Sequence, residues 1–244
     1  MITFSNLGKY GKLGNQLFQI SAVYSHAHKN GFQYIFPEWK YNHYLKTQIK
    51  TGDLPSGLFI HRERDPFSYF PIPNRDNLDL MGYFQNENYL SGLEDNIRDL
   101  LTPSDFVISR INNLEGITAI HIRRGDYLNF PLHHPLPPMD YYNRAIENLK
   151  DISNNFMVFS DDIEWCRNNL SSDFLFSEEK DEFIDLFKMS RCSNFIIANS
   201  SFSWWGSFLN PNKNKIIYAP NNWVGSGYSG TGWRGVYRKE MNIL

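Results

Sequence analysis

The stretch from residue 117 to residue 220 alternates between short apolar runs and amphipathic segments, and this alternation limits the possible folds more than any other feature. Strands that alternate with helices predict a parallel sheet covered by helices. The runs expected to form strands are residues 117–122, 155–160, 194–199 and 215–220, and the segments expected to form helices are residues 140–150, 162–170, 181–190 and 203–210. The helix at 140–150 has a buried face at Tyr142, Ala145, Ile146 and Leu149, and Asp140 is its expected N-cap.

The N-terminal residues predict a strand, a glycine-containing loop, a helix and a second strand. A strand is expected at residues 2–4, and apolar residues recur at helical spacing through residues 13–29. Gly31 is a helix stop signal, and residues 32–36 are expected to form the second strand. This order predicts a βαβ unit at the start of the chain.

Length and composition allow one large α/β domain or two small ones. The chain has 244 residues, of which 41% are hydrophobic, enough to bury a substantial core. Residues 40–116 are rich in Pro, Asn and Gly, with strand candidates at 57–61 and 79–84. We expect an α/β protein with a first domain over residues 1–116 and a second over residues 117–244.

Charge and cysteine content exclude several classes of protein. The net charge is -2 and the basic residues are scattered, which argues against a nucleic-acid-binding surface. Cys166 and Cys192 both lie in expected helices, so we predict free buried thiols, a reducing compartment, no structural disulfide and no zinc. No secretory leader pattern and no long apolar run occurs, so we predict no transmembrane segment.

The segment HIRRGDY at 121–127 follows directly on an apolar strand and carries two adjacent arginines. Ligands of open α/β sheets bind at the carboxyl ends of strands, and a guanidinium near an apolar strand requires an anionic partner. Strand alternation places His121 and Arg123 on one side and Arg124 on the other. One arginine is expected to face a phosphate, and the alternative is a structural ion pair with Asp126.

Two further segments follow expected strands. In NSSFSWWG at 199–206, small hydroxyl residues at a helix start can present backbone N–H groups to an anion, or Ser200 or Ser201 can simply cap the helix. In FSDD at 159–162, the two carboxylates can bind Mg²⁺, contact a guanine or ribose, or cap the next helix, the simplest role for one of them.

The N-terminal loop does not match the dinucleotide-binding pattern, because Gly8, Gly11 and Gly14 are spaced by three residues. An NAD-dependent enzyme is therefore disfavoured. The loop instead places Asn15 and Gln16 at a helix N-terminus, where amides suit a polyol or a phosphate oxygen.

Taken together, GKLGNQLFQ at 11–19, GYFQ at 82–85, HIRRGDY, FSDDIEWC at 159–166 and NSSFSWWG resemble the bacterial α-1,2-fucosyltransferases of glycosyltransferase family 11. The motifs occur in the family's order across most of the chain. The resemblance implies a GT-B-like fold of two Rossmann-like halves, an acceptor-side first half and a GDP-fucose-binding second half. It also implies an inverting transfer of L-fucose from GDP-β-L-fucose to the 2-hydroxyl of a terminal galactose, with no metal and no other cofactor.

The same resemblance assigns roles to particular residues. Arg123 is expected to hold the donor pyrophosphate, supported by Arg124 and Asp126, and Asp161 to contact guanosine. The residues to which it gives a donor-binding role are Asn15, Gln16, His121, Arg123, Arg124, Asp161, Ser200, Ser201 and Phe202.

The acceptor side is where the chain departs from the family pattern. HHPLPPMDYY at 133–142 stands where the family usually has His-Gly and a Cys-Ser pair before the two tyrosines. The general base stays open among His134, His133 and Asp126. We assign catalytic roles to Arg123, Asp126 and His134.

The expected partners are GDP-fucose and a galactose-terminated oligosaccharide or glycolipid, without nucleic acid. The expected location is the cytoplasm or the inner face of the membrane, as a peripheral protein. The alternative function is a non-catalytic nucleotide- or sugar-binding module on the same scaffold.

Overall fold

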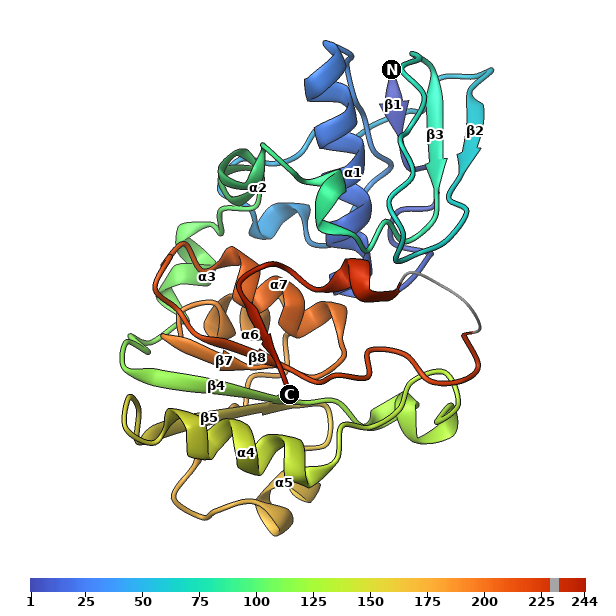
Figure 1. Ribbon diagram of the computed structural model, residues 1–244. Helices are drawn as coiled ribbons and strands as arrows, with labels where there is room; N and C mark the ends of the chain where they lie inside the picture. The colour runs from blue at the N-terminus through green and yellow to red at the C-terminus, as the bar shows by residue number, and fades with distance from the viewer. Residues whose placement is uncertain (229–232) are drawn as a thin grey trace. The chain divides into compact units, whose positions relative to one another are not determined.

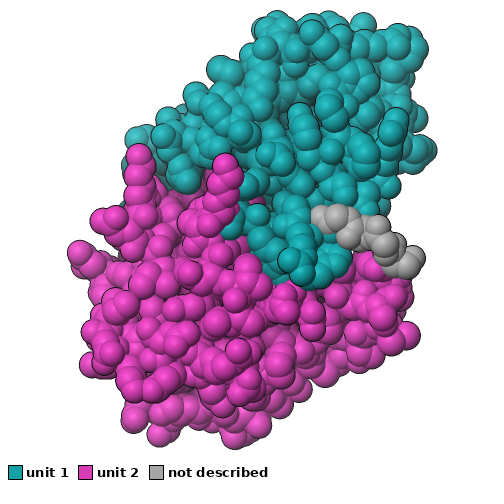
Figure 2. All heavy atoms as spheres, in the orientation of Figure 1, with its two compact units in different colours: residues 1–109, 231–238 teal, residues 110–230, 239–244 magenta. Residues whose placement is uncertain are grey.

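The structure is a computed structural model that describes residues 1–228 and 233–244. The chain divides into two compact units (Figure 2): unit 1 comprises Met1–Ser109 and Thr231–Arg238, and unit 2 comprises Arg110–Gly230 and Lys239–Leu244. The division expected between residues 116 and 117 lies close to the first crossing between the units. The return of a C-terminal segment to unit 1 was not expected from the sequence.

Unit 2 is built on a six-stranded sheet in the order β6-β5-β4-β7-β8-β9, and every pair of neighbours is parallel. The strands are β4 (Ile117–Ile122), β5 (Asn155–Ser160), β6 (Leu175–Phe176), β7 (Asn194–Ile196), β8 (Ile217–Ala219) and β9 (Met241–Ile243). β4 and β5 have the predicted bounds, and they pair in register from Ile117 opposite Asn155 to Ile122 opposite Ser160. The segments that follow them therefore leave the sheet side by side.

Helices cover both faces of this sheet, with α4 and α5 on one face and α6 and α7 on the other (Figure 1). Their bounds are α4 (Met139–Leu149), α5 (Ile163–Asn169), α6 (Glu182–Met189) and α7 (Ser201–Leu209). The predicted face of α4 is confirmed, since Tyr142, Ala145 and Leu149 are buried against the sheet. The prediction for Asp140 was wrong: Pro138 occupies the N-cap position, and Asp140 pairs with Arg144 one turn along the helix.

Unit 1 contains a three-stranded parallel sheet in the order β1-β3-β2 and the long helix α1. Gly31 ends α1 in the left-handed conformation, as predicted. Residues 32–36 form only isolated bridges at Tyr34 and Phe36, so the second strand predicted there is wrong. The elements are β1 (Ile2–Thr3), α1 (Leu13–Asn30), η1 (Asn42–Tyr44), β2 (Phe59–Arg62), β3 (Leu78–Met81), η2 (Glu87–Tyr89), α2 (Glu94–Leu100), α3 (Asp105–Ser109) and η4 (Trp233–Val236).

Both cysteines are free and buried, as predicted. Cys166 lies on α5, whereas Cys192 lies just after α6 rather than within it. Among the described residues, no helix combines the length and the apolar character that crossing a lipid bilayer requires.

Candidate active site

The strand order of unit 2 reverses beside β4. From β4 the chain first adds β5 and β6 along one edge of β4. It then returns and adds β7, β8 and β9 along the other edge of β4. In open parallel sheets, ligands bind outside the carboxyl ends of the strands at such a switch point. The segments that follow β4 and β7 are 123–127 and 197–203, which contain the arginines and serines singled out in the sequence.

Arg123 is held by two aspartates. Its Nη1 atom lies 2.7 Å from Asp161 Oδ2, and its Nη2 atom donates to Asp126 Oδ1. The Arg123 side chain is 15% exposed and that of Asp126 is 45% exposed, so the ion pair with Asp126 is open to solvent on one side. The structural ion pair considered as an alternative is therefore present. A guanidinium has five N–H donors, so two contacts leave three for a ligand.

Arg124 is held by different groups. Its Nε atom donates to Asp162 Oδ2 over 3.0 Å, and the guanidinium carbon lies 3.8 Å from the centre of the Trp165 ring. Asp162 in turn caps α5 by accepting from the Trp165 N–H, which confirms that one of the two aspartates caps the helix. Arg124 thus ties the end of β4 to the start of α5.

The turn after the arginines brings the backbone close to Asp161. A side-chain carbon on Gly125 would collide with the Asp161 carboxylate, so this close approach requires glycine. The same carboxylate accepts the Arg124 N–H over 2.9 Å. Asp161 therefore organises the loop after β4, in addition to the guanosine contact expected of it.

His121 lies inside the protein at the end of β4. It is 4% exposed, and its Nδ1 atom is 2.8 Å from Ser203 Oγ on α7. Burial, with a smaller effect from the Arg123 charge, lowers the pKa of His121 to about 3, so the ring is neutral. His121 connects β4 to α7, and its ring lies against Phe202, with the two ring centres 5.4 Å apart.

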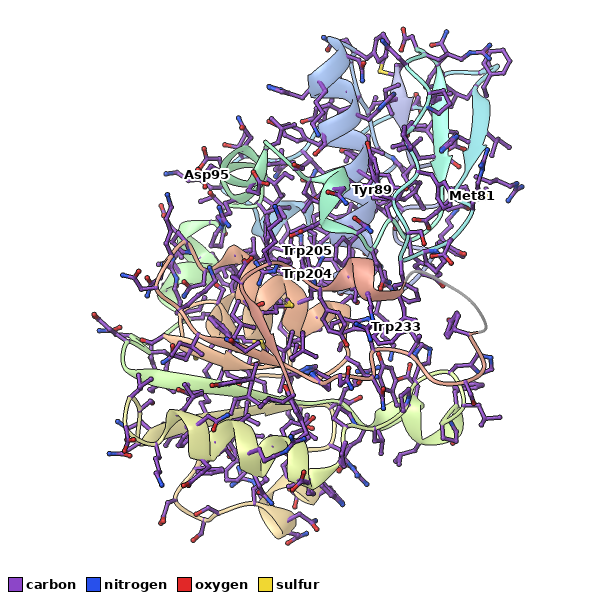
Figure 3. All side chains as sticks on the ribbon, in the orientation of Figure 1. Met81, Tyr89, Asp95, Trp204, Trp205 and Trp233 are labelled. Carbon is purple, nitrogen blue, oxygen red and sulfur yellow. The ribbon has the colours of Figure 1, made fainter. Side chains whose placement is uncertain are left out.

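The start of α7 combines a helix cap with unpaired backbone donors. Ser200 is the N-cap, and its hydroxyl accepts the Phe202 N–H over 3.3 Å. Within the described residues, the N–H groups of Ser201 and Ser203 have no hydrogen-bond acceptor. Trp204 and Trp205 follow on the same helix (Figure 3). Both side chains are fully buried, which anchors this helix start. Free N–H groups and the helix dipole make it suited to an anion.

Tyr127, Asn199 and His134 form a connected group that sequence reasoning missed in part. The Tyr127 hydroxyl donates to the Asn199 carbonyl over 3.0 Å, and the Tyr127 ring stacks on His134 with centres 4.6 Å apart. Asn199 Nδ2 donates to the carbonyls of Pro135 and Trp223. Tyr127 and Asn199 both lie within the HIRRGDY and NSSFSWWG motifs, but their contacts join segments far apart in the chain, which the motifs do not show.

Asn15 and Gln16 belong to unit 1, at the start of α1. Gln16 is buried and uses both ends of its amide internally: Nε2 donates to the Gly11 carbonyl and Oε1 accepts from Trp39 Nε1. Asn15 Oδ1 accepts from Gln85 Nε2 over 2.8 Å. No acceptor for Asn15 Nδ2 occurs among the described residues, so Asn15 is better placed than Gln16 to meet a ligand.

The structure thus gathers one set of predicted site residues at the carboxyl edge of the unit 2 sheet: His121, Arg123, Arg124, Asp126, His134, Asp161, Ser200, Ser201 and Phe202. Within residues 1–228 and 233–244, no group of three or more His, Cys, Asp or Glu side chains is arranged to hold a metal ion.

Comparison with known proteins gives consistent relatives. A family model described as glycosyl transferase family 11 matches residues 59–243. The O-antigen biosynthesis glycosyltransferase WbnK of Escherichia coli is 35% identical over 211 residues, which cover 78% of this chain and 68% of that protein. An alpha-1,2-colitosyltransferase of Escherichia coli is 35% identical over 165 residues, 61% of this chain and 57% of that protein.

A solved structure, the NodZ alpha-1,6-fucosyltransferase soaked with GDP-fucose, matches with a TM-score of 0.55 and 13% identity over 86% of this chain and 92% of that one. This likeness, together with the parallel sheets of both units, confirms the expected α/β, GT-B-like fold.

Proposed function

Because the chain belongs to glycosyl transferase family 11, a fucosyltransferase family, we propose that it transfers L-fucose from GDP-β-L-fucose to the 2-hydroxyl of a terminal galactose. The transfer inverts the anomeric carbon and needs no metal. The observation that carries this proposal is that Arg123 and the unpaired N–H groups at the start of α7 both follow strands at the switch point of unit 2.

The donor diphosphate fits the N–H donors at this edge of the sheet. Arg123 has N–H donors to spare, and Ser201 and Ser203 offer backbone N–H groups at the positive end of the α7 dipole. Asp161, one residue past the end of β5, is the proposed contact to guanosine.

The mechanism follows from where charge develops. Transfer passes through an oxocarbenium-like state, in which the bond from the anomeric carbon to the diphosphate oxygen breaks and negative charge grows on the departing GDP. A preorganised guanidinium stabilises that charge more in the transition state than in the ground state. The acceptor oxygen forms the new bond from the opposite face, which gives inversion, and its proton passes to a base.

His134 is our first candidate for the base, ahead of Asp126 and His133. Burial lowers the pKa of His134, an effect that the Asp126 charge partly opposes, so the imidazole is neutral near pH 7 and able to accept a proton. It also stacks on Tyr127, which is bonded to the loop after β7.

Metal independence is a separate part of the proposal. If arginine and backbone N–H groups supply all the positive charge for the leaving group, an excess of EDTA leaves the initial rate of GDP release unchanged. A rate that collapses with EDTA and returns with Mg²⁺ would show that the aspartates after β5 bind a metal.

The donor sugar has a second candidate, because one relative is named as a colitosyltransferase at 35% identity. The deciding experiment offers GDP-fucose and GDP-colitose in parallel to the purified protein with methyl β-galactoside, and determines the product linkage by NMR. We expect an α-1,2-linked fucoside. Faster transfer from GDP-colitose would reassign the donor, and GDP binding without turnover of either donor would favour a non-catalytic binding module.

A further inference from the structure

Unit 1 carries a stacked pair of tyrosines that the proposed donor site does not use. The rings of Tyr10 and Tyr83 lie with centres 4.6 Å apart and planes inclined by 18°. Tyr10 is 38% exposed, although it stacks on a neighbour and belongs to a short loop before α1. A nearly parallel pair of rings, one of them partly exposed, offers aromatic surface that can pack against the C–H face of a pyranose ring.

One buried amide holds the backbone at Tyr10 and at Gly82, the residue before Tyr83. Gln19, on α1, donates through Nε2 to the carbonyl of Tyr10 over 2.9 Å and to the carbonyl of Gly82 over 3.3 Å. A single side chain therefore sets the positions of the loop before α1 and of the turn after β3. This leaves the ring pair with little freedom to lose when a ligand binds.

The turn that carries Tyr83 is held in an unusual conformation. The two carboxylate oxygens of Glu63 accept the N–H groups of Tyr83 and Phe84, over 2.6 and 2.7 Å. Phe84 has φ of 54°, which is rare for an aromatic residue, and a side-chain carbon on Gly82 would collide with Glu63. Strained backbone of this kind persists only where its surroundings enforce it, and it concentrates at ligand-binding sites.

Polar groups suited to sugar hydroxyls lie on the same two segments. Gln85, two residues beyond Tyr83, donates to Asn15 Oδ1, and the Nδ2 group of Asn15 has no acceptor among the described residues. The side chains concerned, Tyr10, Tyr83, Asn15 and Gln85, carry no formal charge. They suit a neutral sugar better than a diphosphate.

We propose that the Tyr10–Tyr83 pair, together with Asn15, forms the acceptor subsite, on which a neutral pyranose ring of the acceptor glycan stacks. This inference rests on the proposed function, because it assigns to unit 1 the second substrate of that reaction. The rings determine acceptor affinity. Asn15, which the family resemblance assigned to the donor, takes an acceptor-binding role in this proposal.

The test compares removal of each ring with its conservative replacement. In Tyr10→Ala and Tyr83→Ala, we expect KM for methyl β-galactoside to rise roughly tenfold, the effect of losing about 1.4 kcal/mol of binding. In Tyr10→Phe and Tyr83→Phe, which keep the ring, KM stays within about twofold. The dissociation constant for GDP, measured by calorimetry, is the same in all four variants.

Phe106 offers a matched control. It is 56% exposed and stacks on Tyr44 in the same unit, but it lies on α3, away from the Asn15 and Gln85 amides in sequence. Phe106→Ala is expected to leave KM for the galactoside unchanged. A rise equal to that of the tyrosine variants would mean that any lost surface ring acts through stability, and would overturn the subsite.

The outcomes separate this inference from the proposed function. If the wild-type protein neither binds GDP nor releases it from GDP-fucose, the proposed function fails. If the wild type is active and folded alanine variants keep their KM within about twofold, the subsite is wrong. Should those variants not fold, NMR of the wild type decides: methyl β-galactoside shifts the ring signals of Tyr10 and Tyr83 if the subsite exists, and leaves them unchanged if it does not.

Discussion

Arg123 and Arg124 are adjacent in the chain, yet their surroundings give them different capacities. Arg124 is stacked on Trp165 and bonded to Asp162, so its guanidinium is committed to holding α5 against β4. Arg123 is paired with Asp126 and Asp161 and keeps further N–H donors. Alternation along the strand predicted two sides for the two arginines, and the structure adds that each side has its own carboxylates.

We expect Arg123→Ala to lower kcat for GDP release by about 10²-fold or more, the scale of about 3 kcal/mol for one preorganised charged contact to a leaving group. The measurement is a steady-state assay with saturating GDP-fucose and galactoside. Arg144→Ala is the matched control, because Arg144 also pairs with an aspartate in unit 2 but lies exposed on α4. Activity of Arg123→Ala within a few fold of wild type would contradict the assignment.

The role of His134 as the general base predicts a particular dependence of the rate on pH. Its pKa lies below 6.5, so kcat/KM should be level around neutral pH and fall as the pH drops through the pKa and the imidazole gains a proton. His134→Gln is expected to lower kcat and to abolish that acidic limb. His133→Gln, at the exposed neighbouring position, serves as comparison. An unchanged profile in His134→Gln would place the base elsewhere.

The charged and hydroxyl residues of the site could be predicted because strand ends and short motifs mark them in the sequence. The contacts that those residues make could not be predicted, because their partners lie far away in the sequence. Asp161 is an example: its oxygens meet Arg123 and the Arg124 N–H through the pairing of β4 with β5. Asn199, which joins Tyr127 to the backbone of Pro135, was missed for the same reason.

At the scale of elements, the start of α7 separates two roles that serine can play. Ser200 caps the helix from a buried position, whereas the Ser201 hydroxyl has no hydrogen-bond partner among the described residues. Loss of a cap changes the free energy of unfolding, whereas loss of a phosphate contact changes the affinity for GDP. The two serines therefore make a matched pair.

Ser200→Ala is expected to lower the free energy of unfolding by about 1 kcal/mol, the usual cost of losing a cap. Ser201→Ala should leave that free energy unchanged and weaken GDP binding severalfold. Urea unfolding and GDP calorimetry measure the two effects. A result in which Ser201→Ala destabilises the protein and leaves GDP affinity intact would remove the Ser201 hydroxyl from the donor site, while the backbone N–H, which the variant keeps, stays untested by it.

The bounds of β4 and β5 were predicted correctly. Both faces of these strands are buried, so each strand is a nearly continuous apolar run in the sequence. Short elements were not predicted. β6 and β9 have two and three residues, too few to show a period. Residues 32–36 have strand composition, but only Tyr34 and Phe36 form bridges to other segments, since pairing depends on neighbours that composition does not reveal.

At the scale of the whole molecule, the buried histidine gives unit 2 a defined response to pH. The folded-state pKa of His121, about 3, is lower than its ordinary value of 6.5. Between these two pH values the imidazole is protonated in the unfolded chain and neutral in the folded chain. Its contribution to stability is therefore present above pH 6.5 and is lost as the pH falls toward 3.

Between about pH 7 and about pH 5, this single group should remove about 2 kcal/mol from the free energy of unfolding. Urea midpoints followed by tryptophan fluorescence at several pH values measure the slope. His121→Gln, even if less stable overall, should show a flatter dependence on pH. An equally steep slope in that variant would assign the acid sensitivity to other groups.

The two units share the C-terminal part of the chain. Residues 233–238, with η4, belong to unit 1, and β9 at Met241–Ile243 completes the edge of the sheet in unit 2. A ribosome that makes this protein therefore cannot release a finished unit 1 before it begins unit 2. Synthesis therefore completes unit 1 only at Arg238, after most of unit 2 has been made, and completes the sheet of unit 2 only when β9 emerges.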